Sequence, residues 1–260
     1  MKIALAQLRV NPGDCKTNLA RMLNLTEEAA KQEADLIAFP EMSVGGYLLG
    51  DRWTDDDFVD DLMACNDQIA RTAKKHNIAV AFGNIFKTNQ MLGQDGRAAR
   101  FNAIYVYNNE GKPALRLGGH AAFGVKNVHF KTNLPNYRFF DDERYWLSAL
   151  DYLRFAGVEQ KAFYQPFVIR NKQGEDSLIG FALCEDLWCK DYQVHGGVVN
   201  PSKWLYENGA DAVVNLSASP WTYGKHRARD NAVKFVYRCF WRQKTSGLVP
   251  EDECRPTQIG

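Results

Sequence analysis

Three reactive side chains lie at or near the ends of apolar segments: Glu41, Lys131 and Cys184. Cys184 directly follows the apolar run 177–183, and Glu41 comes just after the run 34–39, which Pro40 ends. A short apolar run that stops at polar residues predicts a buried strand. Because the carboxyl ends of such strands form the ligand crevices of open α/β folds, the ends of one sheet are expected to bring these side chains together.

These residue types together suit the hydrolysis of an amide or a nitrile. A thiol is mostly protonated at neutral pH, so a nearby carboxylate can accept its proton while the sulfur attacks carbon. The oxyanion that forms needs a cation or hydrogen-bond donors, and a lysine ammonium supplies both. A carboxylate whose pKa is raised by burial can then protonate the leaving amine and activate water. Taken singly, Glu41 and Lys131 also fit solvated surface charges and Cys184 fits a structural thiol, so residue type alone leaves both interpretations open.

The segments around these residues alternate between strand and helix patterns, which is typical of a layered α/β fold. Helices are expected from a Thr17 cap to Glu33, over 55–75 and over 201–208. Strands are expected at 2–8, 34–39, 77–83, 101–107, 167–169, 178–183 and 211–216. A polar loop is expected at 88–97.

Two further segments carry a weaker pattern. The connection 115–165 is rich in aromatic residues, and a connection this long inside a compact domain is expected to shape a site or an interface. A basic and aromatic stretch runs from Asp230 to Trp241. Its pattern favours a helix with one core face and one solvated face over a nucleic-acid-binding surface. No strand is evident in the tail 243–260.

Composition excludes several classes of protein. The chain has 260 residues, of which 45% are hydrophobic and 24% charged, and these are ordinary globular values. Its formal net charge of +1 gives no general attraction to nucleic acid or to an anionic membrane. The six cysteines form neither a disulfide framework nor zinc spacing, and the five histidines form no metal constellation. With no signal peptide or membrane-length apolar run, a cytoplasmic protein is expected.

Four stretches also carry a resemblance to a known family. They are Phe39-Pro40-Glu41-Met42, Lys131-Thr132-Asn133-Leu134-Pro135-Asn136-Tyr137, Leu183-Cys184-Glu185-Asp186-Leu187-Trp188, and Asn215 to Trp221 with Gly224-Lys225. The first three resemble the signature stretches of the nitrilase, or carbon–nitrogen hydrolase, superfamily. The second, third and fourth are more narrowly similar to the glutaminase domain of glutamine-dependent NAD synthetases. The motifs follow the family's order over roughly the first 225 residues.

The resemblance implies an α-β-β-α sandwich, with Glu41 as general base, Lys131 as oxyanion stabiliser and Cys184 as nucleophile. It implies a substrate pocket and a further carboxylate. The pocket would be built from Tyr137, Glu185, Trp188 and Ser217, with Arg227 or Arg229 on the substrate carboxylate. The further carboxylate would be Asp142 or Glu143. The implied reaction is hydrolysis of glutamine, or a similar small amide, to supply ammonia to a synthetase domain or subunit, and a homo-oligomer is expected.

The sequence departs from that family in two respects. It has no Ser-Gly-Gly-x-Asp-Ser loop, no Walker sequence and no glycine-rich dinucleotide fingerprint, so no ATP, NAD or metal cofactor is expected. Residues 1–225 are expected to form the amidohydrolase domain. Residues 226–260 are expected to be a divergent or truncated segment, because residues 235–260 do not align with the family. This would leave the sandwich incomplete and impair the activity.

Three other functions stay open on the sequence alone. The first is a nitrilase-like amidase that acts on another small amide or nitrile. The second is an inactive remnant that serves only as an interaction module. The third is a Cys/His hydrolase using His129 or His195, which lie within reach in the sequence but in no recognisable partner motif.

Overall fold

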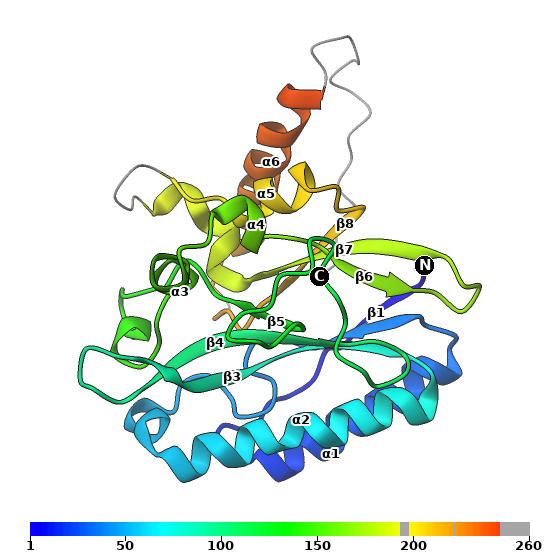
Figure 1. Ribbon diagram of the computed structural model, residues 1–260, viewed down its shortest axis with the longest axis horizontal. Helices are drawn as coiled ribbons and strands as arrows, with labels where there is room; N and C mark the ends of the chain where they lie inside the picture. Colours follow the sequence, from blue (N-terminus) through cyan, green and yellow to red (C-terminus); the bar gives the residue numbers. More distant parts are fainter. Residues whose placement is uncertain (193–197, 221, 245–260) are drawn as a thin grey trace.

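A computed structural model describes residues 1–192, 198–220 and 222–244, with side chains described as far as residue 236. Within this part of the chain, two β-sheets are stacked between helices, in the order helix, sheet, sheet, helix (Figure 1). The expected α-β-β-α sandwich is therefore confirmed. His195, Trp221 and the tail 245–260 lie outside the described residues.

The first sheet has five strands in the order β1-β2-β3-β4-β5. These are β1 (Ile3–Leu5), β2 (Leu36–Ala38), β3 (Ala79–Leu92), β4 (Ala98–Tyr107) and β5 (Val128–Phe130). The first three are parallel, and β4 is antiparallel to both of its neighbours. As a result β5 runs in the same direction as β2, and their carboxyl ends lie at the same edge of the sheet.

The second sheet has three strands in the order β6-β7-β8. They are β6 (Phe167–Arg170), β7 (Asp176–Leu183) and β8 (Ala212–Leu216). β6 and β7 form an antiparallel hairpin, whereas β7 and β8 are parallel, so β7 and β8 also end at a common edge.

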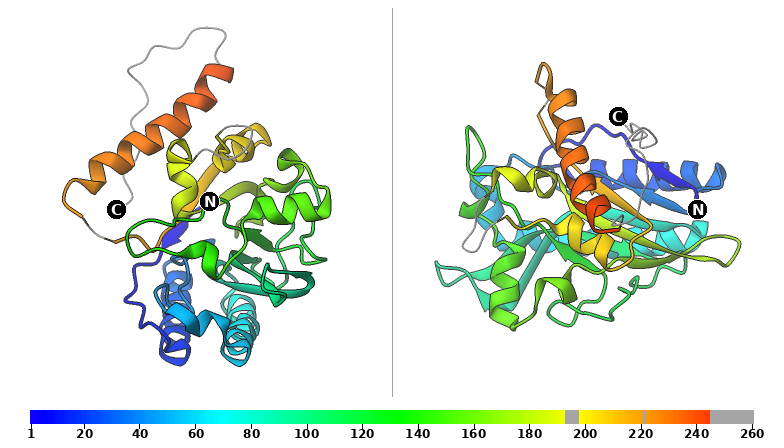
Figure 2. Two further views of the ribbon diagram at one scale, coloured as in Figure 1. Left: turned by 90° about the vertical axis from the view of Figure 1, so that its left-hand side faces the viewer. Right: turned by 90° about the horizontal axis from the view of Figure 1, so that it is seen from above.

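Helices cover the outer faces of both sheets. α1 (Cys15–Lys31) and α2 (Asp56–His76) lie below the first sheet, on the opposite side of the molecule from α6 (Lys225–Lys244), as Figure 2 shows. α5 (Pro201–Glu207) packs on β7. The connection between the sheets holds α3 (Ala149–Ala156) and α4 (Gln160–Phe163), and the short 3₁₀ helices are η1 (Gly50–Thr54), η2 (Asp142–Arg144) and η3 (Cys184–Asp191).

Strand periodicity explains the layers. On β2, Leu36 and Ala38 face the second sheet, whereas Ile37 between them faces α1 and α2. On β3, Ala81 and Phe82 divide in the same way. Because successive side chains point to opposite faces of a strand, a nearly continuous apolar run buries both faces of the sheet. The small alanines lie between the sheets.

Some sequence-based boundaries need correction. Thr17 does not cap α1: the helix begins at Cys15, and the Asp14 carboxylate accepts a hydrogen bond from the Thr17 backbone N–H at 3.0 Å. The predicted loop 88–97 is partly strand, because β3 continues to Leu92 and pairs with β4 in a long hairpin. The proposed boundary after residue 225 falls in the first turn of α6, and the division into segments stays a prediction.

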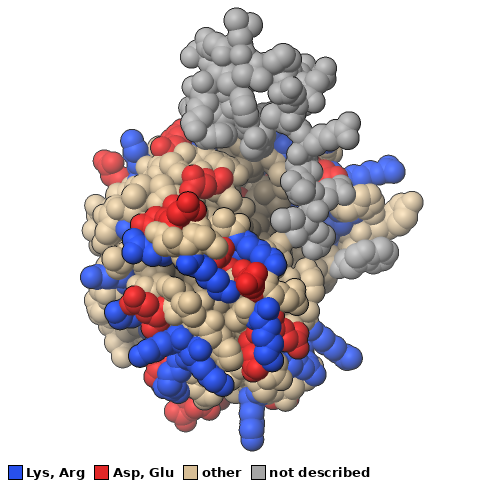
Figure 3. Space-filling model, turned by 90° about the vertical axis from the view of Figure 1, so that its right-hand side faces the viewer, with Lys and Arg blue, Asp and Glu red and all other residues tan. Residues whose placement is uncertain are grey.

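Acidic and basic side chains are interspersed over the face shown in Figure 3, as the small net charge leads one to expect. Among the described residues, no helix combines the length and the apolar character needed to cross a bilayer.

Candidate functional site

The predicted reactive residues follow the carboxyl ends of three strands. Glu41 follows β2, Lys131 directly follows β5, and Cys184 directly follows β7. A hydrogen bond joins the two sheets at this edge: the backbone N–H of Ala218, just past β8, donates to Glu41 Oε2 at 3.0 Å. Strand direction in each sheet therefore brings the three segments to one place. The expectation that one sheet would supply all three needs correction, because Glu41 and Lys131 follow strands of the first sheet and Cys184 follows a strand of the second.

Glu41 and Lys131 form a buried ion pair. Lys131 Nζ lies 2.9 Å from Glu41 Oε1, and each residue is 1% exposed. The side-chain amide of Asn102, on β4, donates to the same Glu41 oxygen at 2.8 Å. With Ala218 on the other oxygen, both oxygens of the Glu41 carboxylate are held in a fixed orientation.

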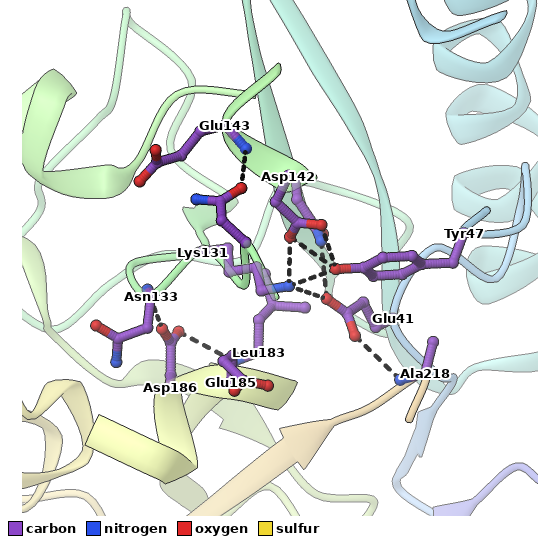
Figure 4. A network of polar contacts seen from close by, with 12 residues as sticks. Glu41, Tyr47, Lys131, Asn133, Asp142, Glu143, Leu183, Glu185, Asp186 and Ala218 are labelled. Atoms are coloured by element: carbon purple, nitrogen blue, oxygen red, sulfur yellow. Dashed lines mark hydrogen bonds and ion pairs between the residues drawn. The ribbon is translucent and has the colours of Figure 1, made fainter. Parts of the chain in front are cut away.

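Lys131 has two further oxygen partners, Asp142 Oδ2 at 2.9 Å and the Tyr47 hydroxyl at 2.8 Å (Figure 4). The Tyr47 hydroxyl in turn donates to Asp142, 2.7 Å from Oδ2. Burial disfavours the ammonium, but the carboxylates of Glu41 and Asp142 outweigh it and raise the pKa of Lys131. The site therefore holds a permanent positive charge away from bulk water.

Asp142 settles a choice that the sequence left open. Its carboxylate is 2% exposed and contacts Lys131, whereas Glu143 is exposed and points away from the cluster. Burial raises the pKa of Asp142 to about 6, against the opposing effects of Lys131 and the Tyr47 hydrogen bond. Of the two candidates, Asp142 is the carboxylate that joins Glu41 and Lys131.

Cys184 sits at a sharp turn between β7 and η3, with a φ of +33° that few residues other than glycine adopt. The side chain is buried, at 7% exposed. Burial and the negative charge of Glu41 raise the pKa of the Cys184 thiol, while Lys131 and a hydrogen bond with Ser217 act in the opposite direction. The resting sulfur is thus a neutral thiol within the electrostatic influence of both predicted partners.

Glu185, the residue after Cys184, provides a further buried carboxylate. Its Oε1 accepts hydrogen bonds from the hydroxyls of Tyr137 at 3.0 Å and Tyr192 at 2.9 Å. Tyr137 is half-exposed, so these three side chains lie closer to solvent than the buried Glu41–Lys131 ion pair. Burial, then the charge of Glu185, raise the pKa of Tyr137 to about 12, so this hydroxyl remains a donor near neutral pH.

The remaining predicted residues make fewer contacts. Trp188 is half-buried in η3, and Ser217 follows β8 with its hydroxyl 2.5 Å from Asn215 Oδ1. Arg227 is exposed and Arg229 half-buried in the first turns of α6. Neither arginine forms a hydrogen bond or ion pair with the side chains that the structure describes.

His129 does not match the arrangement of a Cys/His hydrolase. Its ring is buried on β5, 5.5 Å from the ring of Phe163 and 5.9 Å from that of Tyr164. Burial holds the pKa of His129 well below its ordinary value, and the charge of Arg116 adds to this effect. These neighbours describe a neutral core histidine.

Sequence reasoning missed three residues that complete the site: Tyr47, Asn102 and Tyr192. Asn102 had a usable signal, because an amide inside the apolar run 101–107 is expected to be buried and so requires a partner. Tyr47 and Tyr192 had none, since their hydroxyls meet Asp142 and Glu185 only through the folding of loops. Among the side chains that the structure describes, which end at residue 236, no group of three or more potential metal ligands occurs.

Tyr47 and Asp142 also line a cavity of about 290 Å³. Aromatic side chains, including Trp53, Phe140 and Trp146, form much of its wall. Two of the oxygen partners of Lys131 therefore border an aromatic-walled space.

The fold and this arrangement of thiol, carboxylate and ammonium correspond to a class of hydrolases that act on carbon–nitrogen bonds. The family model described as "Carbon-nitrogen hydrolase" matches residues 2–232. The chain belongs to the carbon–nitrogen hydrolase family.

Within this family, the chain is similar to glutamine-dependent NAD synthetases. Over 247 residues the chain is 29% identical to the glutamine-dependent NAD(+) synthetase of Synechocystis sp., covering 92% of this chain and 37% of that protein. The solved glutamine-dependent NAD+ synthetase of Acinetobacter baumannii, in complex with ADP, is 27% identical, with a TM-score of 0.63 over 90% of this chain and 35% of that one. The chain spans about a third of the length of these relatives.

Comparison with a solved amidase structure also supports the fold. An amidase from Nesterenkonia sp. AN1, solved as a double mutant in complex with acrylamide, superimposes with a TM-score of 0.60. The match covers 87% of this chain and 68% of the amidase at 16% identity. Similarity at that level shows a shared fold.

Proposed function

We propose that the protein hydrolyses the side-chain amide of glutamine to glutamate and ammonia, with Cys184 as nucleophile, Glu41 as general base and Lys131 as oxyanion stabiliser. The observation that carries the proposal is the buried Glu41–Lys131 ion pair, at 2.9 Å, whose charges both act on the Cys184 thiol. The names of the relatives point to glutamine as the amide.

The first half-reaction forms a thioester. Because Cys184 rests as a neutral thiol, Glu41 takes its proton as the sulfur attacks the amide carbon. The C=O electron pair moves onto oxygen, and the Lys131 ammonium stabilises this oxyanion. When the intermediate collapses, the C–N bond breaks and Glu41 returns the proton to the nitrogen, which leaves as ammonia.

The second half-reaction restores the thiol. The Glu41 carboxylate removes a proton from a water molecule, whose oxygen attacks the thioester carbon. Lys131 again stabilises the oxyanion, the C–S bond breaks, and the sulfur recovers the proton held by Glu41. The overall change is one amide and one water converted to one acid and one ammonia, without a metal ion or nucleotide.

The buried carboxylate of Glu185 supports an amino acid as the substrate, because it suits the α-ammonium group. Tyr137 and Tyr192 both donate hydrogen bonds to that carboxylate. Trp188 lies in the same 3₁₀ helix as Cys184, and Ser217 forms a hydrogen bond with the Cys184 thiol. Arg227 or Arg229 would bind the α-carboxylate through the bidentate geometry of a guanidinium group.

The ammonia would be delivered to a synthetase domain or subunit. This part of the proposal is supported by the coverage of the relatives, since the chain matches about a third of proteins named as NAD synthetases. No cofactor is proposed for the half of the reaction assigned to this chain.

The test is ammonia release from glutamine by the purified chain. We expect turnover that falls at least about a thousandfold in Cys184→Ala, since loss of a nucleophile leaves only background catalysis. Cys15→Ala is the matched control, because Cys15 is a half-buried thiol at the start of α1, and it should retain turnover. Hydrolysis of other small amides but not glutamine would contradict the substrate. No hydrolysis of any amide would favour the inactive remnant.

A further inference from the structure

Asp186 contacts both chain segments that carry the proposed reacting groups. Its side chain is fully buried, at 0% exposed. Oδ1 accepts hydrogen bonds from the backbone N–H groups of Thr132 at 3.0 Å and Asn133 at 2.8 Å, and Oδ2 accepts one from Leu183 at 3.3 Å. We propose that Asp186 is a positioning residue that fixes the distance between Lys131 and Cys184, an inference that rests on the proposed function.

The hydrogen-bond partners of Asp186 lie next to the proposed reacting residues in the sequence. Thr132 directly follows Lys131, and Leu183 directly precedes Cys184. One carboxylate therefore joins the backbone beside the ammonium to the backbone beside the thiol, and Figure 4 shows it lying between Asn133 and Leu183. Both oxygens of this side chain accept hydrogen bonds from backbone N–H groups, so the link constrains the two segments at the same time.

Both segments need such a link where they leave their sheets. The Lys131 N–H still bonds to the Asn102 carbonyl of β4 at 2.9 Å, whereas the next two N–H groups turn away from the sheet to Asp186. On the other side, Cys184 has a left-handed φ of +33°, which the surrounding structure must enforce. The bond from Leu183 to Asp186 closes that turn.

Asp35 offers a matched control elsewhere in the molecule. It is also a buried aspartate, 6% exposed, whose oxygens accept backbone N–H groups from distant segments. The Lys2 N–H donates to it at 2.6 Å and the Lys172 N–H at 2.9 Å. Asp35 precedes β2 and Lys172 follows β6, so this link joins the two sheets at the start of β2, the opposite end of that strand from Glu41.

The experiment compares Asp186→Asn with Asp35→Asn. The amide keeps the shape of the side chain but places an N–H group against a backbone N–H, which releases one segment in each variant. Two quantities are measured: kcat and KM for glutamine, and the rate at which iodoacetamide alkylates Cys184, read by peptide mass spectrometry.

We expect Asp186→Asn to lower kcat about a hundredfold with KM changed less than about threefold, because a small displacement of a reacting group is costly. Alkylation of Cys184 should slow about tenfold, since Lys131 would no longer favour the thiolate. Asp35→Asn should lower the melting temperature while keeping kcat and the alkylation rate near those of the wild type. Equal kcat and equal alkylation rates in the two variants would overturn the proposal.

The alkylation readout separates this inference from the proposed function, because it requires no glutamine. If the wild type does not hydrolyse glutamine yet Asp186→Asn alone slows alkylation, positioning stands and the substrate is wrong. If Asp186→Asn does not fold, Asp186→Glu keeps both oxygens on a longer side chain. Slow alkylation in folded Asp186→Glu would support positioning, and a wild-type rate would overturn it.

Discussion

Two carboxylates and a phenol surround one buried ammonium, and this arrangement sets the charge of the site. Lys131 lies within 2.9 Å of oxygens from Glu41, Asp142 and Tyr47. Removing one partner of a buried ion pair leaves an uncompensated charge, so each carboxylate matters beyond its own contact. Asp142 differs from an ordinary aspartate, because burial raises its pKa to about 6.

The raised pKa of Asp142 predicts how the free energy of unfolding changes with pH. Folded Asp142 binds a proton more tightly than it does in the unfolded chain, whose value is near 3.8. Its contribution to the free energy of unfolding is therefore fully present below pH 4 and is lost as the pH rises through 6. We expect the stability of the wild type relative to Asp142→Asn to fall by roughly 2–3 kcal/mol between pH 4 and pH 7.

Urea unfolding of both proteins at the two pH values measures that difference. The Glu143→Gln variant is the control, because Glu143 is exposed and should show no comparable change. A stability difference between wild type and Asp142→Asn that is independent of pH, or that grows as the pH rises, would contradict the assignment.

The residues that the sequence could indicate are those at strand ends. Glu41, Lys131 and Cys184 adjoin apolar runs, and the motifs around them carry a family resemblance that residue type alone could not supply. The supporting contacts were out of reach, because the Tyr47 hydroxyl meets Asp142 across 95 positions of the sequence. A pattern of local spacing carries no information about such a pair.

At the scale of secondary structure, the segment that carries Glu41 rests directly on β3. Gly83 N–H bonds to the Pro40 carbonyl, and the Ser43 hydroxyl bonds to the Gly83 carbonyl, each at 3.2 Å. A Cβ added at Gly83 would lie 2.4 Å from Met42 N and 2.6 Å from Glu41 Cα. The absence of a side chain at this position allows the loop to bring Glu41 over the sheet.

We expect Gly83→Ala to push that loop away, since backbone atoms cannot yield as a flexible side chain can. The free energy of unfolding should fall by about 1–3 kcal/mol, as for other overpacked sites. Glutamine hydrolysis by the folded protein should fall about a hundredfold, because Glu41 would move away from Cys184. Chemical denaturation and ammonia release measure the two effects.

Gly180→Ala on β7 is the control. Its added Cβ would meet side-chain atoms of Leu205 and Val213 at 3.1 Å, away from the Glu41 loop. This variant should lose stability without losing turnover in the folded fraction. Equal losses of turnover in the two glycine variants would show that packing alone, and not the placement of Glu41, explains the effect.

Periodicity predicted the elements better where both faces of a strand or one face of a helix are buried. β2, β7 and β8 were expected because their apolar runs are nearly continuous, and α2 because its apolar residues repeat at helical spacing. β5 was missed, because it has only three residues inside a long aromatic connection and exists through its pairing with β4.

For the molecule as a whole, the stacking of two sheets brings together site residues that no single strand or helix carries. The layer between them is built from small and branched apolar side chains of β2, β3 and β4 on one side and from branched and aromatic side chains of β6, β7 and β8 on the other. Glu41 and Ser217 are far apart in the sequence. They follow β2 and β8, and this apolar layer packs the sheets that contain those two strands against each other. The layered class followed from the alternating patterns, whereas the contact between the sheets did not.

The predicted homo-oligomer concerns the association of whole molecules. Among the described residues β8 is an edge strand, with β7 as its neighbour in the sheet order, and the edge of a sheet offers backbone groups for pairing with another chain. We expect sedimentation to give a mass that is a multiple of the 29.5 kDa chain at micromolar concentration. A single-chain mass that persists on raising the concentration would contradict it.

The most direct test of the central claim uses a diazoketone analogue of glutamine, an electrophile that a glutamine-specific thiol attacks. Peptide mass spectrometry after brief exposure should find the label on Cys184 and not on Cys15 or Cys65, with glutamine protecting and asparagine failing to protect. Labelling spread evenly over these three cysteines, or labelling of Cys184 that glutamine does not slow, would contradict the account.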